Sequence, residues 1–276
     1  MDAFFTTATV LSTVGSSITI ADKSVVLLKV IKKISNLIKH GRSNILIFGH
    51  GGAGKTTLGY KLSGSDLPSY KYVPSVTTEK LKIKGNLYGK YFIATGQQRS
   101  INLNWSELFR NMASGKFKGI INVVSYGYHS YKSEASFKET EYYKSKGDKD
   151  FLEHYLAERR KSEISQLRTL AENIKNTKGK FWMVTLVNKQ DLWYDVKNDV
   201  ESYYLNGDYA KIIKQISDRK GDQFIHHYVS ASLVDSNLKI GKGFNLNSVP
   251  MYDEQLRLEN FNNFIVLLNQ MIDNGD

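Results

Sequence analysis

The residues with the clearest chemical signature run from position 49 to 56 and read Gly-His-Gly-Gly-Ala-Gly-Lys-Thr. This spacing fits the pattern G-x-x-x-x-G-K-[ST] in full, in which glycines let successive backbone N–H groups close around a phosphate. Lys55 adds a point charge for the β- and γ-phosphates, and Thr56 offers a hydroxyl to Mg²⁺. The predicted nucleotide contacts in this loop are Gly51, Gly52, Ala53, Gly54, Lys55, Thr56 and Thr57.

A second group of polar residues, Asn188-Lys189-Gln190-Asp191, indicates which base accompanies the phosphates. The Asp191 carboxylate can accept two hydrogen bonds, from N1–H and the 2-amino group of guanine. Adenine offers neither donor and would leave a buried charge unpaired, so discrimination should be large. Asn188 and the stem of Lys189 can frame the base and steady the phosphate loop.

Both groups follow apolar runs that suit buried parallel strands, at residues 44–48 and 181–187. The helical pattern 55–62 comes directly after the phosphate loop, so its N-terminus adds a favourable dipole for an anion. A third apolar run, 224–229, ends in Ser-Ala-Ser. The backbone of that segment could meet the guanine oxygen, which predicts contacts from Ser230, Ala231 and Ser232.

With these motifs in this order, the chain resembles the Ras-like small GTPases, over about residues 43–276. It looks most like the Arf type, because of the sequence NKQDL and because Gly96-Gln97 is followed by Trp105 and a strand near 119–125. The resemblance implies an α/β Ras-like P-loop G domain. Its six-stranded, mostly parallel sheet would be flanked by helices, with GTP or GDP and Mg²⁺ at the strand ends.

The resemblance also assigns roles to three loop residues. Ser75, in Tyr-Val-Pro-Ser-Val, stands where the family places a threonine that reaches Mg²⁺, although the segment also reads as a simple proline turn. Gly96 and Gln97 stand at the catalytic positions, where a glutamine positions the attacking water.

One motif departs from the family: the strand before Gly96 carries Ile93 where an aspartate normally helps to hold Mg²⁺. Loss of such an outer carboxylate commonly costs about 10–100-fold in metal affinity or activity. We therefore expect either a GTPase switch with weak intrinsic hydrolysis or a non-hydrolysing scaffold that binds GTP or GDP structurally. An ATP-dependent kinase or motor would contradict the Asn188–Asp191 motif.

Composition bounds the partners and the compartment. The 276 residues include no cysteine, which excludes disulfides and thiolate chemistry and fits a cytoplasmic protein. The formal charge of +11 attracts anionic partners. No arginine-rich tract or aromatic-basic motif is present, so nucleic acid is an unlikely partner, and we expect effector or regulatory proteins instead.

Residues 1–42 are predicted to form an N-terminal extension. Within residues 24–40, helical spacing places apolar residues on one face and basic residues on the other. The six basic residues between 23 and 42 have no acidic residue among them. Such a helix could bind peripherally to an anionic membrane surface, dock on a partner, or pack on its own domain. Asp2 argues against a secretory signal and stands where an acylated glycine would be needed, so myristoylation is not expected.

The second half of the domain is predicted to contain one insertion and two long helices. Residues 129–150 are polar with balanced charge and indicate a surface insertion. Helices are expected over 151–174, with Leu167, Leu170, Ala171 and Ile174 on one face, and over 253–272, which should close the sheet.

Overall fold

The computed structural model of the chain describes residues 44–63, 79–82, 90–93, 101–130, 147–240 and 244–275. The predicted N-terminal extension, 1–42, lies outside the described residues, as do Ser75, Gly96 and Gln97. Those predictions are therefore not tested by the fold.

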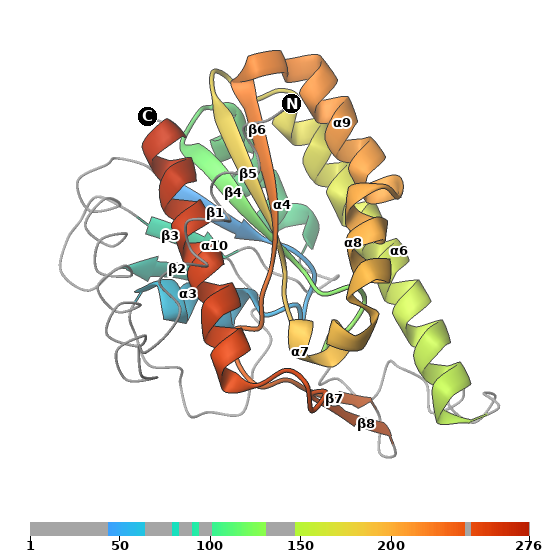
Figure 1. Cartoon of the computed structure of the whole chain (residues 1–276). Coiled ribbons are helices and arrows are strands. Elements are labelled where there is room, and N and C mark those ends of the chain that lie inside the picture. Colours follow the sequence, from blue (N-terminus) through green and yellow to red (C-terminus); the bar gives the residue numbers. More distant parts are fainter. Residues whose placement is uncertain are drawn as a thin grey trace.

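The main sheet has the strand order β2-β3-β1-β4-β5-β6, and every neighbouring pair is parallel except β2 with β3 (Figure 1). Its strands are β1 (Asn44–Phe48), β2 (Glu79–Lys82), β3 (Lys90–Ile93), β4 (Phe117–Val124), β5 (Phe181–Val187) and β6 (Phe224–Ser230). Because β1, β4 and β5 are parallel neighbours, the segments that follow them meet at one edge of the sheet.

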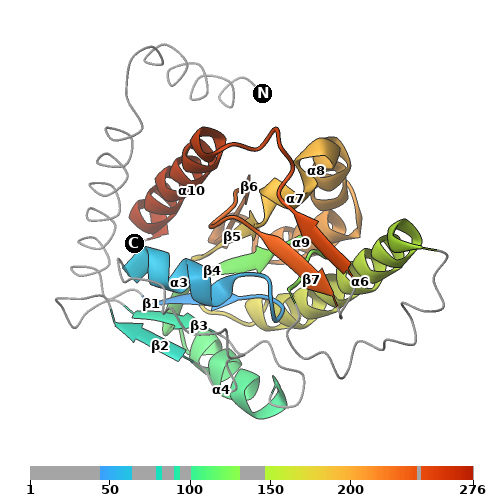
Figure 2. The same ribbon diagram turned by 90° about the horizontal axis from the view of Figure 1, so that it is seen from below.

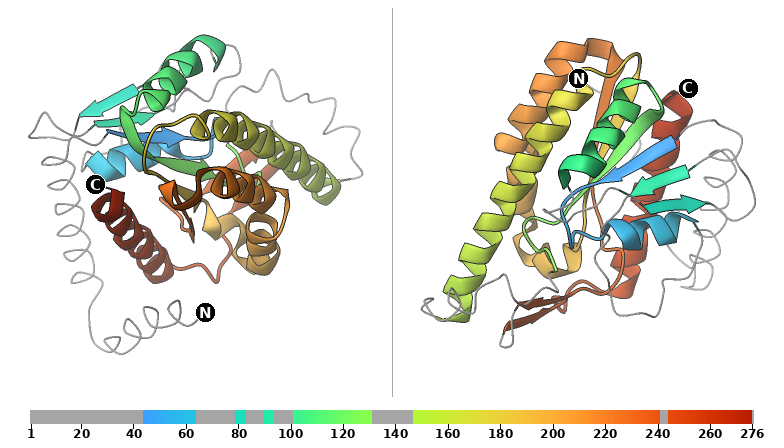
Figure 3. Two further views of the ribbon diagram at one scale, coloured as in Figure 1. Left: turned by 90° about the horizontal axis from the view of Figure 1, so that it is seen from above. Right: turned by 180° about the vertical axis from the view of Figure 1, so that it is seen from behind.

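Helices cover both faces of this sheet, as the end-on views show (Figures 2 and 3). They are α3 (Lys55–Ser63), α4 (Ile101–Ala113), α6 (Asp148–Ile174), α7 (Gln190–Trp193), α8 (Lys197–Leu205), α9 (Asp208–Lys220) and α10 (Glu254–Gly275), with short 3-10 turns η2 (Tyr194–Val196) and η3 (Gly221–Gln223). The predicted α/β class, a mostly parallel sheet flanked by helices, is confirmed.

Side chains alternate between two cores along the central strands, as the period of two requires. Leu46 and Phe48 of β1 face the core shared with α4, α6 and α9, whereas Ile45 and Ile47 face the core shared with α3 and α10. The helix stripe predicted for 151–174 is confirmed, since Leu167, Leu170, Ala171 and Ile174 are all buried.

The first residues of the predicted surface insertion pack inward, and its last residues are exposed but already belong to a helix. His129 is fully buried, and α6 already begins at Asp148, where Asp148 and Asp150 supply favourable negative charge to its first turn. The segment as a whole is polar, so its composition does not show that the first residues after β4 pack inward. Residues 131–146 lie outside the described part of the chain.

A two-stranded antiparallel hairpin, β7 (Asn237–Ile240) with β8 (Phe244–Asn247), lies between β6 and α10. Figure 1 places it near α7, below the end of the main sheet where β5 stops. Its residues Leu238 and Phe244 are buried in the main core, so the hairpin is packed against the domain. Across the described ranges, no helix has the length and apolarity needed to cross a bilayer.

Candidate functional site

The phosphate loop follows β1 and ends where α3 begins at Lys55. Gly52 and Gly54 have φ values of +78° and +107°, which L side chains rarely adopt. A Cβ on Gly52 would lie 2.0 Å from the carbonyl oxygen of Ser130, and one on Gly54 would lie 2.2 Å from Nδ2 of Asn188. The loop is therefore closely surrounded, and glycine is required at both positions.

Lys55 occupies the first position of α3 and is buried to 6% exposure. Its Nζ donates to the carbonyl oxygen of His50, 2.8 Å away, so the ammonium reaches back across the loop that it closes. Thr56 and Thr57 follow in the first helical turn and are partly exposed. This places a cation, two hydroxyls and a helix N-terminus beside one Gly-rich loop, as anion binding requires.

Asn188 joins the phosphate loop to the segments after β5 and β6. Its side-chain Nδ2 donates to the carbonyl oxygen of Ala53 at 2.7 Å, and its Oδ1 accepts from the backbone N–H of Leu233 at 3.1 Å. The Asn188 backbone N–H donates in turn to the carbonyl of Val124. One buried amide thus fixes three loops relative to one another.

Lys189 supports the loop after β4. Its Nζ donates to the carbonyl oxygen of Tyr128 at 2.6 Å and lies 2.7 Å from Oγ of Ser130. Burial lowers the pKa of Lys189 to about 7, against the attraction of Asp191. The residue has a left-handed backbone, with φ of 62° and ψ of 36°, which turns the chain sharply from β5 into α7.

Asp191 has no exposed surface and is surrounded by hydroxyl donors. Ser232 Oγ donates to its Oδ1 at 2.5 Å and accepts from the Asp191 backbone N–H at 2.8 Å. Ser236 and Ser248 also donate to the carboxylate. The predicted base-reading carboxylate is therefore a buried, fully hydrogen-bonded group.

The structure brings only one member of the predicted Ser-Ala-Ser triplet to this carboxylate. β6 continues to Ser230, whose Oγ pairs with the hydroxyl of Tyr228, and the Ala231 N–H donates to the Val187 carbonyl. Ser232 reaches Asp191, and the next residue, Leu233, reaches Asn188. The strand is one residue longer than its apolar run, so Ser230 belongs to β6 and Ser232 lies in the loop that follows.

A buried polar network that the sequence patterns did not predict lies beside the phosphate loop. Glu163 of α6 is 2% exposed and accepts from the backbone N–H groups of Ser125 and Gly127 at 2.9 and 3.3 Å. It also accepts from the Tyr204 hydroxyl at 2.7 Å and lies 2.8 Å from Nε2 of His129. Burial raises the pKa of Glu163, and the donors around it oppose that effect. A single glutamate in a helical sequence pattern does not indicate that its side chain will accept hydrogen bonds from the backbone of a distant loop.

His50, which lies inside the phosphate loop, packs on this network. Its ring stacks on that of His129, with centroids 4.5 Å apart and planes 6° from parallel. Burial, reinforced by the neighbouring His129, lowers the pKa of His50 to about 3. Burial also holds the pKa of His129 well below its ordinary value. The stacked pair is therefore neutral near pH 7 and serves to position the phosphate loop.

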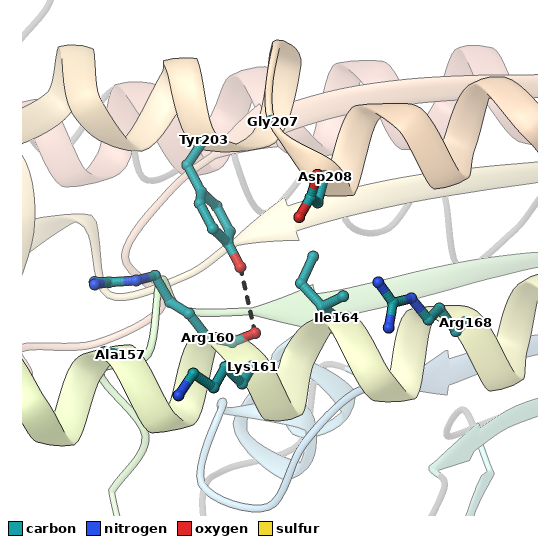
Figure 4. A pocket seen from close by; sticks show the side chains of 8 residues that line it. All are labelled: Ala157, Arg160, Lys161, Ile164, Arg168, Tyr203, Gly207 and Asp208. Carbon is teal, nitrogen blue, oxygen red and sulfur yellow. Dashed lines mark hydrogen bonds between the residues drawn. The ribbon is translucent and has the colours of Figure 1, made fainter.

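A separate pocket of about 570 Å³ lies between α6 and the α8–α9 junction (Figure 4). Its lining residues are Ala157, Arg160, Lys161, Ile164, Arg168, Tyr203, Gly207 and Asp208. The Tyr203 hydroxyl donates to the Arg160 carbonyl across it, at 3.3 Å. None of these residues belongs to the phosphate loop or to the 188–191 segment, so the pocket is distinct from the predicted nucleotide site.

Comparisons with known proteins add little to this geometry. No family model and no curated protein matches the chain. Solved structures that do match include an ADP-ribosylation-factor-like GTP-binding protein, the small COPII coat GTPase of Encephalitozoon cuniculi, in complex with GDP. It is 19% identical, with 75% of this chain and 79% of that chain covered and a TM-score of 0.36.

Two further matches are the mammalian SRP receptor and a variant of S. thermophilus NFeoB bound to GDP and AlF4⁻. The SRP receptor is 16% identical, the match covers 69% of this chain and 91% of the receptor chain, and the TM-score is 0.38. The second is 13% identical, covers 69% and 57%, and has a TM-score of 0.36. Because these TM-scores are low, the matches support no statement about function. We base the proposed function on the site itself.

The fit of the phosphate loop predicts a sharp difference between two glycine variants. Gly54→Ala adds a Cβ that must displace the Asn188 amide, so it should lower both the melting temperature and nucleotide affinity. Gly115→Ala is the matched control, because Gly115 also has positive φ (+77°) but nothing lies within 4 Å of its Cβ position. Thermal melts of both variants test this; equal losses would show that backbone strain alone is responsible.

The buried histidines predict that stability falls in mild acid. His50, His129 and His226 all have lowered pKa values, with His226 at about 4 because of burial. The unfolded chain therefore binds more protons than the folded one below about pH 6.5, and the free energy of unfolding decreases as pH falls. Glu163, with a raised pKa, offsets part of this trend.

Urea unfolding between pH 7.5 and 5 measures the effect. His226→Gln should flatten the pH dependence, since it removes one of the contributing imidazoles while an amide can still hydrogen-bond to Thr185. A free energy of unfolding that stays constant or rises on acidification would contradict the assignment of neutral, buried imidazoles.

Proposed function

We propose that the chain binds a guanine nucleotide and acts as a slow GTPase switch. The observation that carries the proposal is the tie between Asn188 and Ala53, which holds a Gly-rich phosphate loop against a buried Asn-Lys-x-Asp turn. A loop that cradles phosphates and a carboxylate that can read a base thus share one edge of the sheet. Neither feature alone would distinguish a guanine site from other phosphate sites.

The phosphates fit the loop and the helix that follows it. The N–H groups between Gly51 and Lys55, the Lys55 ammonium and the N-terminus of α3 would hold the anionic oxygens. Mg²⁺ would be held by the Thr56 hydroxyl and by Ser75, which the resemblance supplies. When bound, the ion neutralises charge that develops on the phosphates. Among the residues that the structure describes, no cluster of three or more His, Asp or Glu side chains could hold a metal by itself.

The base would be read by Asp191, which is buried and therefore discriminates strongly between paired and unpaired ligands. Ser232 orients the carboxylate through its two hydrogen bonds with Asp191. Asn188 keeps this reading group at a fixed distance from the phosphate loop. Guanine should be preferred over adenine for this reason.

Hydrolysis would be slow because the strand position beside the phosphate loop lacks a carboxylate. Ile93 pairs with Ile47 of β1, two residues before the loop begins, so an acid at position 93 would stand close to the site. Gln97 would position the attacking water. The alternative is a non-hydrolysing scaffold, and the absence of that acid favours it as much as it favours slow turnover.

Regulation would come from partner proteins, as the resemblance implies for a switch of this class. An effector would distinguish the GTP from the GDP form, and a partner arginine could neutralise transition-state charge. The basic helix predicted at 24–40 would bring the domain to an anionic membrane surface or to a partner.

The proposal predicts a base preference and a phosphate dependence. GTP and GDP should bind more tightly than ATP by orders of magnitude, and Lys55→Ala should remove most of the affinity, because it deletes a cation from a buried loop. Titration with fluorescent nucleotides measures both. Lys214→Ala, an exposed cation on α9, is the charge-matched control and should bind normally. Equal affinity of the wild type for ATP and GTP would end the guanine assignment.

Single-turnover hydrolysis separates the switch from the scaffold. We expect very slow turnover in the wild type, a further decrease in Gln97→Leu and an increase in Ile93→Asp, which restores an acid beside the loop. Nucleotide affinity is measured in parallel to exclude loss of binding. Fast unaided turnover by the wild type would contradict the argument from Ile93, and no turnover in any variant would favour the scaffold.

A further inference from the structure

The Asp191 carboxylate is already saturated by donors of the protein itself. Oδ1 accepts from Ser232 Oγ at 2.5 Å and from Ser236 Oγ at 2.9 Å. Oδ2 accepts from the Ser236 backbone N–H at 2.6 Å and from Ser248 Oγ at 2.7 Å. An ionised carboxylate offers about four lone-pair sites, and here four donors fill them. A guanine edge brings two more donors to the same group.

We propose that Ser236 and Ser248 compete with guanine for Asp191 and thereby set the affinity and selectivity of the site. The proposal rests on the function proposed above, and it assigns residues that the motif does not contain. The two hydroxyls take one site on each carboxylate oxygen. Guanine N1–H and the 2-amino group also need one site on each oxygen, so the serine pair imitates the edge of the base.

The same two hydroxyls are the donors that can leave at least cost. Ser232 is 1% exposed and exchanges two hydrogen bonds with Asp191, so it belongs to the fixed frame of the site. Ser236 and Ser248 are partly exposed, so water can reach either hydroxyl when it leaves Asp191. Water then replaces the lost partner.

The hairpin itself need not move for this exchange. Ser236 precedes β7 and Ser248 follows β8, so the two residues face each other across the base of the hairpin, near α7 (Figure 1). Leu238 and Phe244 remain buried in the core, and the Val249 N–H still donates to the Asp191 carbonyl at 2.8 Å. The hairpin therefore presents two displaceable donors from a fixed platform.

This arrangement has two consequences for binding. Each guanine hydrogen bond to Asp191 replaces an existing bond to a charged group, so guanine affinity is lower than the motif alone would give. A ligand that lacks the paired donors has no bond to Asp191 to gain whether or not the serines are present, so the pair lowers guanine affinity more than adenine affinity and narrows the preference for guanine.

The experiment compares the wild type with the double variant Ser236→Ala, Ser248→Ala in titrations with fluorescent GDP and ATP analogues. Removing one competing donor from each oxygen should tighten GDP binding by about tenfold or more. ATP affinity should change less, because adenine cannot use the freed carboxylate sites. Asn237→Ala is the matched control: it breaks the exposed Asn237–Asn247 pair of the same hairpin at 2.6 Å without touching Asp191, and it should bind like the wild type.

Thermal melts of each variant show whether it is folded. If the double variant does not fold, the single variants Ser236→Ala and Ser248→Ala are titrated instead, and each should tighten GDP binding by a smaller factor. GDP affinity that is unchanged or weaker in folded variants overturns the competition, while a wild-type preference for GDP leaves the proposed function standing. If neither the wild type nor any variant binds a guanine nucleotide, the proposed function itself is wrong. Equal tightening by Asn237→Ala would also overturn the proposal, since loosening of the hairpin would then explain the gain.

Discussion

The hydrogen bond from the Asn188 side chain to the Ala53 carbonyl is the contact on which the candidate site depends. It spans 135 positions of the chain and is buried, so its loss would leave an unsatisfied carbonyl inside the domain. The same amide accepts from Leu233, which brings the segment after β6 to the same point. The parallel order β1-β4-β5-β6 makes this bond possible, because it delivers the loops after β1, β5 and β6 to one edge of the sheet.

A second constraint is the buried hydrogen-bond network around Glu163. Glu163 binds two backbone N–H groups and an imidazole of the segment after β4, together with the Tyr204 hydroxyl of α8, and so fixes the segment that packs against the phosphate loop. A buried carboxylate with this many donors is well compensated, but removing any partner would be costly. Lys189 also secures this segment, through its hydrogen bond to the Tyr128 carbonyl. The site is therefore held by polar groups rather than by apolar packing alone.

The sequence was sufficient where the chemistry is local. The phosphate loop and the 188–191 turn each need a fixed spacing within a few residues, and apolar runs identified the strands that precede them. It was insufficient where partners lie far apart in the chain. Glu163 looks like one more acid on a polar helix face, and His129 lies in a segment whose composition indicates a surface loop. The hydrogen bond from Ser232 to Asp191 depended on where β6 ends, and apolar patterning does not fix strand ends to one residue. The serines at 236 and 248 carried no signal, because isolated serines in turns are common.

The central claim is that Asp191 reads the base, and an exchange of specificity tests it most directly. Xanthine carries a carbonyl where guanine carries its 2-amino group, so an amide at position 191 can pair with xanthine as the carboxylate pairs with guanine. Affinities for GDP and XDP are measured by competition for the wild type and for Asp191→Asn. The account predicts that the wild type prefers GDP and that the variant prefers XDP. A variant that keeps the wild-type order, at undiminished affinity, would show that the base does not meet Asp191 and would contradict the account.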